Sequence, residues 1–208
     1  MNLILIGYRA SGKTSVGKRL SDLLQRPFCD TDALIRQQTG KTVKEIVLEG
    51  GWPAFREAEK AVIAGLASQE GAVIALGGGA VLDLANVEVL KPRGLFIWLQ
   101  ADQETVQDRL SGDRASAEQR PPLSLPGNGH DGEVLSQRIP IYRAIADLLI
   151  DTTGRSIEAV ADEIVAALKT GRGTGPVCSG LSAGETGGEI IGEVPIEPFG
   201  NHIELPGE

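Results

Sequence analysis

Cysteine and aromatic residues are scarce in this sequence. Aromatic residues make up 4% of the 208 residues, and the 2 cysteines are Cys29 and Cys178. These two lie far apart and form no CxxC or Cys/His pattern, so neither a disulfide framework nor a structural zinc site is indicated. The core must therefore be built mostly from aliphatic side chains, and we expect Cys29 to be a small buried residue.

Long apolar runs and an excess of basic residues are also absent. No run approaches the roughly 18 residues of a membrane span, and residues 3–6 are too few and too close to Met1 for a signal peptide. The 20 Lys and Arg against 28 Asp and Glu give a net charge of -8, so no general basic surface is available to neutralise a nucleic-acid backbone. We therefore expect a cytoplasmic protein that binds neither membranes nor nucleic acid.

The composition changes near residue 171. After Arg172 the chain has six glutamates, nine of its 27 glycines and four of its 11 prolines, but no Lys or Arg. Such a segment does not easily offset the entropy lost on ordering. We predict one domain over residues 1–170 and a flexible acidic, Gly/Pro-rich extension over 171–208. Alternatively, the short apolar patch 189–196 could add a strand to a partner's sheet.

Short apolar segments alternate with amphipathic stretches in the first 170 residues. This pattern predicts an α/β fold, a three-layer αβα arrangement with helices on both faces of a short parallel sheet. Residues 111–132, rich in Gly, Pro, Ser and charge, form the one long insertion, which we expect to be mobile. The expected strands are 3–6, 72–76, 95–99 and 148–150, and the expected helices are 14–24, 55–68, 102–110, 133–146 and 156–168.

Residues 7–14 read Gly-Tyr-Arg-Ala-Ser-Gly-Lys-Thr and fit the P-loop pattern G-x-x-x-x-G-K-[ST] between a strand and a helix. Glycine at 7 and 12 lets backbone N–H groups surround an anion without a side chain in the way. Lys13 would reach the β and γ phosphates, and the Thr14 hydroxyl would bind Mg²⁺. A purely architectural glycine turn would not require Lys13-Thr14, so the pattern predicts binding of ATP with Mg²⁺.

Asp30 and Asp32 follow the apolar pair Phe28-Cys29. On an extended strand, side chains at i and i+2 point to the same face. Two carboxylates near a P-loop suit a metal site together with a substrate hydroxyl. The alternative is a helix N-cap at Thr31 or Asp32, because an apolar stretch follows directly.

A series of short motifs occurs in an order and approximate spacing that resemble shikimate kinases. The resemblance covers residues 2 to about 168. It implies a P-loop kinase of the nucleoside-monophosphate-kinase type with a mobile lid at about 111–132, which phosphorylates the 3-hydroxyl of shikimate in chorismate and aromatic amino-acid biosynthesis. The motifs are the P-loop followed by Val16-Gly17, then Asp30-Thr31-Asp32, Phe55-Arg56-Glu57-Ala58-Glu59, Leu76-Gly77-Gly78-Gly79-Ala80-Val81, Arg120-Pro121-Pro122-Leu123 and Arg138-Ile139-Pro140-Ile141-Tyr142.

The resemblance also implies how the nucleotide is bound. It makes Thr14 a magnesium ligand, with Asp30 supporting the ion directly or through water. Arg109 and Arg155 match positions that pack near adenine, although both are equally plausible as surface residues. Arg120 matches the lid arginine over the phosphates, with Arg114 as a competing candidate. The implied nucleotide-binding residues are Gly7, Ala10, Ser11, Gly12, Lys13, Thr14, Ser15, Arg109, Arg120 and Arg155.

For the substrate, the resemblance makes Arg56 and Arg138 a pair that clamps the shikimate carboxylate, which suits the planar guanidinium fork. Asp32 matches the carboxylate that binds the substrate hydroxyls, either as a base or only as an orienting group. The implied catalytic residues are Lys13, Asp32 and Arg120, and the implied substrate-binding residues are Asp32, Arg56, Gly78, Gly79 and Arg138.

Several alternatives remain open. Each arginine could be a solvated surface charge, and Arg56 could pair with Glu59 at i,i+3, which would also hold it in a binding rotamer. Another small-metabolite kinase, such as a gluconate kinase, would share the P-loop and lid but not need the Asp32, Arg56 and Arg138 set. A regulatory nucleotide-binding module acting through the tail is the rival from another class. We expect a monomer.

Overall fold

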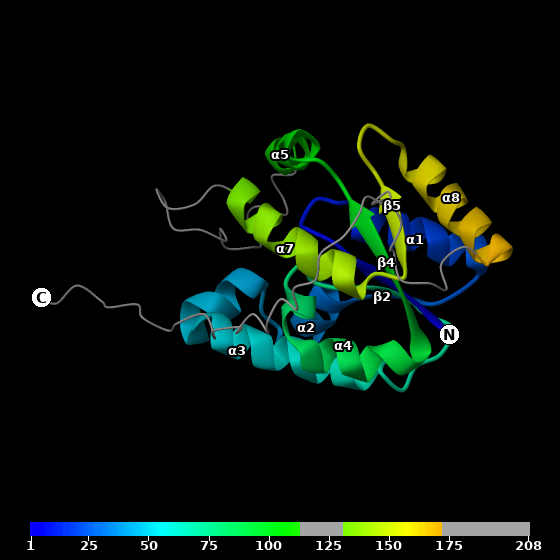
Figure 1. Cartoon of the computed structure of the whole chain (residues 1–208). Helices are drawn as coiled ribbons and strands as arrows, with labels where there is room; N and C mark the ends of the chain where they lie inside the picture. Colours follow the sequence, from blue (N-terminus) through cyan, green and yellow to red (C-terminus); the bar gives the residue numbers. More distant parts are fainter. Residues whose placement is uncertain (113–130, 172–208) are drawn as a thin grey trace, which may run out of the picture. The chain divides into compact units, whose positions relative to one another are not determined.

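Five parallel strands form one sheet in the order β2-β3-β1-β4-β5. The structure, a computed structural model, describes residues 1–112 and 131–171 (Figure 1). Each pair of neighbouring strands is parallel, so the predicted α/β fold with a parallel sheet is confirmed. The strands are β1 (Asn2–Ile6), β2 (Phe28–Asp30), β3 (Val73–Ala75), β4 (Gly94–Gln100) and β5 (Leu148–Asp151).

Helices make the crossovers between the parallel strands, as parallel pairing requires. Two short 3-10 helices flank helix α4: η1 (Ala80–Leu82) precedes it and η2 (Lys91–Arg93) follows it. The α-helices of the described residues are α1 (Lys13–Leu24), α2 (Thr31–Thr39), α3 (Val43–Leu66), α4 (Leu84–Leu90), α5 (Gln103–Gly112), α7 (Asp131–Ile145) and α8 (Ile157–Thr170).

Each face of the sheet has its own apolar core, because side chains alternate along a strand. Leu3 and Leu5 of β1 pack with Ile164 and other side chains of α1 and α8, whereas Ile4 and Ile6 pack with residues of α2, α3 and α7. Figure 1 shows α1 and α8 side by side, and α3 running alongside α4. The two cores hold the sheet rigidly, so the carboxyl ends of its strands provide a fixed platform.

The sequence pattern missed α2 and α4 and shortened α3. Helix α2 is only 9 residues long and buries Thr31 and Ile35 alone, and α4 has 7 residues, so neither carries a clear helical period. Helix α3 begins well before the expected residue 55. It is two helical stretches joined at a kink, with Gly51 at φ 71° and Pro53 just after it.

Three further expectations concern the burial of Cys29, the lid and the C-terminal extension, and membrane-spanning segments. Cys29 is half-buried rather than fully buried, because β2 is an edge strand. Most of the predicted lid, with Arg114 and Arg120, and the extension after residue 171 lie outside the described residues. In the part of the chain that is described, no helix has the length and apolar character to cross a membrane.

The core beneath α8 allows a matched test of packing. Ile164 is 0% exposed and Ile157, on the same helix, is 41% exposed. We expect Ile164→Ala to lower the free energy of unfolding by about 2–5 kcal/mol, through lost burial and a residual cavity. Ile157→Ala should lower it by less than about 1 kcal/mol. Urea unfolding of both variants measures the difference, and equal losses would contradict the packing described for α8.

Candidate active site

The P-loop joins β1 to α1 in a conformation that its glycines permit. Gly7 has φ 141° and Gly12 has φ 95°, values that favour glycine strongly. A Cβ at Gly7 would overlap the carbonyl oxygen of Leu99 on the neighbouring strand β4. The loop therefore lies directly against strand β4. At Gly7 and Gly12 no side chain of the loop covers its backbone amides.

Ala10 has φ 60°, a left-handed conformation that is uncommon for a residue with a side chain. Arg109 of α5 supports this strained turn: its Nη1 donates to the Ala10 carbonyl oxygen at 3.2 Å, and its Nη2 donates to the Thr152 carbonyl oxygen at 2.7 Å. The Thr152 hydroxyl also lies 3.4 Å from the Ser11 carbonyl oxygen. Thus Arg109 and Thr152 hold the P-loop from the side of β5.

Lys13 is folded over the P-loop. Its Nζ donates to the carbonyl oxygens of Gly7 and Tyr8 at 2.9 and 2.7 Å. The ammonium group therefore lies at the mouth of the loop, where the helix N-terminus of α1 also favours negative charge.

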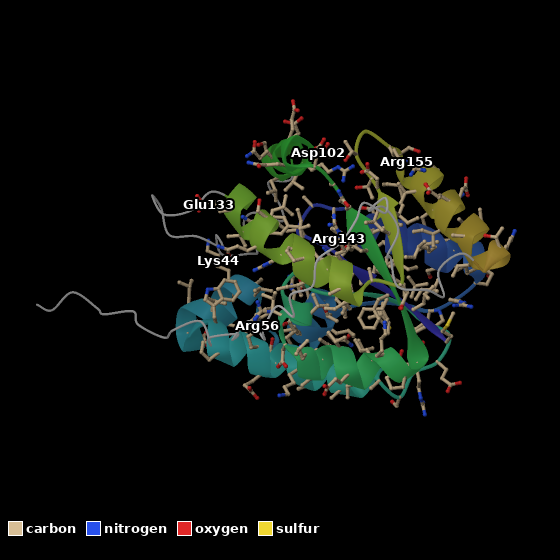
Figure 2. All side chains as sticks on the ribbon, viewed as in Figure 1. Lys44, Arg56, Asp102, Glu133, Arg143 and Arg155 are labelled. Atoms are coloured by element: carbon tan, nitrogen blue, oxygen red, sulfur yellow. The ribbon has the colours of Figure 1, made fainter. Side chains whose placement is uncertain are left out.

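A large cavity, here called the P-loop cavity, opens above this loop. Except for Gly7, the described residues predicted to bind ATP all line it, including Arg109 and Arg155. Arg155 lies between β5 and α8 (Figure 2), donates to the Asp151 and Ala159 carbonyl oxygens at 3.1 and 3.2 Å, and pairs with Glu163. Its guanidinium group is thus fixed beside the cavity instead of being a freely solvated charge.

Thr14 and Asp30 form an oxygen-rich corner of the P-loop cavity. The Thr14 hydroxyl donates to Asp30 Oδ2 at 2.7 Å, while Asp30 Oδ1 accepts from the backbone N–H groups of Asp32 and Ala33 at 3.1 and 3.2 Å. Asp30 is therefore the N-cap of α2, so the prediction of a cap at Thr31 or Asp32 was wrong. A hydroxyl and a carboxylate are ligands that Mg²⁺ prefers, since it binds one or two carboxylates together with substrate phosphates.

The predicted strand geometry of the two aspartates was also wrong. Asp30 ends β2, but Asp32 lies in the first turn of α2, so the two side chains do not share one face of an extended strand. The cap at Asp30 nevertheless brings Asp32 to the same edge of the sheet, where both carboxylates line the P-loop cavity.

A smaller cavity, here called the arginine cavity, lies next to the P-loop cavity. Both cavities are lined by Asp32, Gly77 and Gly78. All five predicted substrate-binding residues line the smaller one. Its lining residues are Arg9, Asp32, Val43, Trp52, Phe55, Arg56, Glu59, Gly77, Gly78, Gly79 and Arg138.

Arg56 is placed by packing and by charge. Its guanidinium carbon lies 5.7 Å from the Trp52 ring centre and 5.3 Å from that of Phe55, and the two rings meet edge to face. Arg56 also pairs with Glu59 one turn later, so the predicted i,i+3 pair is present. Figure 2 shows Arg56 on the side of α3 that faces α7.

Glu59 is a buried carboxylate, with a side chain 1% exposed. One oxygen pairs with Arg56; the other, Oε1, has no hydrogen-bond partner among the described residues and faces Gly77, where a Cβ would lie only 2.6 Å away. Burial raises the pKa of Glu59, against the opposing effect of Arg56. Burying a charged carboxylate in this way lowers the free energy of unfolding.

Arg138 reaches the arginine cavity from α7. Its guanidinium carbon lies 5.6 Å from the ring centre of Tyr8, and its Nη1 is 3.4 Å from the Gly78 carbonyl oxygen. Arg9 also lies over the Tyr8 ring, at 5.9 Å. Arg9 was not among the predicted site residues, and its place inside the P-loop motif was the only sequence signal that it lies here.

The buried charge of Glu59 predicts a pH dependence of stability. Because the pKa is raised above its ordinary value of 4.5, the stability that this group contributes is fully present below pH 4.5 and is lost as the pH rises through the raised pKa. Relative to the wild type, Glu59→Gln should therefore gain stability across that interval. Urea unfolding at a series of pH values measures the difference, and a difference that does not vary with pH would contradict the raised pKa.

Comparison with known proteins agrees with this geometry. The shikimate kinase family model matches residues 9–169. A shikimate kinase of Syntrophus aciditrophicus is 44% identical over 180 residues, which cover 82% of this chain and 92% of that protein. The structure of the shikimate kinase from Acinetobacter baumannii in complex with shikimate is 31% identical, has a TM-score of 0.73, and is matched over 82% of this chain and 94% of that chain. The chain therefore belongs to the shikimate kinase family.

Proposed function

We propose that this protein transfers the γ-phosphoryl group of ATP to the 3-hydroxyl of shikimate, giving shikimate 3-phosphate and ADP. The observation that carries the proposal is the wall of Asp32, Gly77 and Gly78 shared by the two cavities. A nucleotide whose phosphates lie on the P-loop and a small acid in the arginine cavity would meet at this wall. Holding the two reactants together in this way removes much of the entropic cost of the reaction.

The arginine cavity has the chemistry that a polyhydroxylated carbocyclic acid requires. Arg56 and Arg138 supply two cations for the carboxylate, and the planar fork of each matches carboxylate geometry. Trp52 and Phe55 supply an apolar wall for the ring. Gly78 and Gly79 line this cavity and carry no side chain of their own, so substrate hydroxyls can approach their backbone groups closely.

Asp32 is the proposed partner of the attacking hydroxyl. Its carboxylate lines both cavities, so it is placed to accept a hydrogen bond from a hydroxyl that faces the γ-phosphorus. In the reaction, the hydroxyl oxygen forms a bond to the γ-phosphorus while the bond from that phosphorus to the β–γ bridging oxygen of ATP breaks, and this oxygen leaves on ADP. The hydroxyl proton passes to Asp32, if this acts as a base, or to solvent. Positioning and charge stabilisation supply most of the catalysis in such transfers.

Residues of the P-loop cavity are proposed to bind ATP. The backbone of the loop, together with Ser15 beside it, surrounds the phosphates, and Lys13 exchanges its bonds to the Gly7 and Tyr8 carbonyl oxygens for phosphate oxygens. Arg109 and Arg155 flank the nucleotide, and Arg120, from the segment outside the described residues, is the proposed lid arginine. Thr14 and Asp30 would hold Mg²⁺, which when bound neutralises charge on the phosphates.

The described residues that line the P-loop cavity and the arginine cavity include groups proposed to bind both reactants, and we propose a monomer. We also propose that the protein acts in the cytoplasm, where ATP and Mg²⁺ are available. Residues 171–208 are proposed to be an extension outside this catalytic domain.

A comparison of acceptors tests the proposed reaction. ADP release from Mg-ATP should be stimulated by shikimate and not by gluconate or AMP. Gluconate is an open chain without the ring that Trp52 and Phe55 would contact, and AMP has no carboxylate for Arg56 and Arg138. Quinate, which keeps a carboxylate but lacks the ring double bond, is a demanding fourth acceptor and should be turned over far less well. ATP binding without turnover on any acceptor would contradict the proposal and favour a regulatory nucleotide-binding module.

Two variants separate the roles of the cavities. Lys13→Ala should lower kcat about 100-fold or more, because it removes charge stabilisation at the transferring group. Arg138→Ala should raise the shikimate KM by about 10- to 100-fold, the loss expected for a charge-assisted hydrogen bond. Arg143→Ala is the matched control, because Arg143 lies exposed on the same helix α7. Unchanged shikimate KM in Arg138→Ala would contradict the carboxylate clamp.

A further inference from the structure

Tyr142 is a buried polar residue to which the proposed reaction gives no role. It lies on α7, is 0% exposed, and packs its ring against Trp98 of β4 at a centroid distance of 5.9 Å. Its hydroxyl donates to the carbonyl oxygen of Gly78, a residue 64 positions away in the sequence. An apolar side chain of the same shape could make these packing contacts, so packing does not explain the hydroxyl. The hydrogen bond to Gly78 does.

The Gly77–Gly79 turn has no side chains, so its position depends on backbone hydrogen bonds. The Gly77 N–H donates to Thr31 Oγ1 at 2.9 Å, which fixes the turn to the start of α2. The Gly78 carbonyl oxygen is the second anchor, held by Tyr142 and approached by Arg138 Nη1 at 3.4 Å. The turn is thus held at one end by Thr31 and at the other by α7.

The bond to the Gly78 carbonyl also orients the next amide. In a trans peptide the C=O and N–H groups point in opposite directions, and the described chain has no cis peptide bond. Fixing the Gly78 carbonyl oxygen toward α7 therefore turns the Gly79 N–H away from α7. The α-carbon of Gly79 lies beside the guanidinium group of Arg56, which a Cβ at Gly79 would overlap.

Tyr142 also sets the position of Arg138. The two residues are four apart on α7 and therefore lie on the same face of the helix. Between them is Pro140, which has no N–H and removes the helical hydrogen bond to the Ser136 carbonyl. The hydroxyl of Tyr142 fixes this part of α7 to the Gly77–Gly79 turn. Burial raises the pKa of Tyr142 to about 12, so the hydroxyl stays a donor at neutral pH.

We infer that Tyr142 is a positioning residue for the acid substrate: its bond to Gly78 fixes Arg138 and the glycine turn relative to each other, so that carboxylate and hydroxyl contacts form together. This inference rests on the proposed function. The inference concerns the arginine cavity, because the Tyr142 hydroxyl contacts the turn from the side of α7, the helix that carries Arg138.

Tyr142→Phe tests the inference, since it keeps the ring packed on Trp98 and removes only the hydroxyl. We expect the shikimate KM to rise about tenfold, the effect of one lost hydrogen bond to a positioned group, while kcat and the ATP KM change less than about threefold. The matched control is Ile164→Val, a small loss in the other core, which should lower the melting temperature without changing the shikimate KM. A shikimate KM within twofold of the wild type in Tyr142→Phe would overturn the inference. Equal changes in both KM values and kcat would overturn it too, since they indicate a merely structural role.

Thr31→Val tests the other anchor of the turn independently. It removes the acceptor of the Gly77 N–H and should also raise the shikimate KM more than the ATP KM. An unchanged shikimate KM would contradict the step that connects the position of the turn to substrate binding. Wild-type protein is assayed first: no shikimate-dependent turnover there would contradict the proposed function itself, whereas normal wild-type turnover with unchanged variants contradicts only the role of Tyr142.

Discussion

The site depends on how closely other segments approach the Gly77–Gly79 turn. A Cβ at Gly77 would lie 2.6 Å from Glu59 Oε1 and 3.1 Å from Asp32 Oδ1, and one at Gly78 would lie 3.4 Å from the Gly7 carbonyl oxygen. The turn therefore brings the P-loop, α2 and α3 to one place at the end of β3. Because the wall shared by the two cavities consists of the Gly77 and Gly78 backbone and the Asp32 side chain, bound reactants can meet there.

Charge is divided within the arginine cavity. Arg9, Arg56 and Arg138 bring positive charge to it, and Asp32 and Glu59 place carboxylates beside Gly77. A ligand with a carboxylate at one end and hydroxyls at the other matches this division. Glu59 is nearly inaccessible to solvent and its pKa is raised by burial, so the pair with Arg56 is costly to fold. That cost is consistent with a site that keeps Arg56 in one rotamer.

Local sequence patterns predicted the parts of the site that are local in the chain. The P-loop and the Arg56–Glu59 pair depend on neighbours a few residues away, and both are present as expected. The fold class followed from the alternation of apolar and amphipathic segments. The N-cap at Asp30 was missed because α2 begins directly after β2 ends. Asp30-Thr31-Asp32 was interpreted as one extended segment, but it spans the end of a strand and the start of a helix.

The contacts that hold the site together could not be read from the sequence. Tyr142 reaches Gly78 across 64 positions, and Arg109 reaches Ala10 across 99. Each depends on the strand order, which brings the segments that follow β1, β3 and β4 to the same end of the sheet. The residue types at these positions fit many surroundings, so no period or spacing marks them.

The most direct test of the account is the structure of a ternary complex with shikimate and a non-hydrolysable ATP analogue. The account predicts the shikimate carboxylate between Arg56 and Arg138, and the 3-hydroxyl at the wall of Asp32, Gly77 and Gly78, in line with the γ-phosphorus of the analogue. Shikimate bound with its carboxylate toward Asp32, or outside the arginine cavity, would contradict the claim that the shared wall is where phosphoryl transfer occurs.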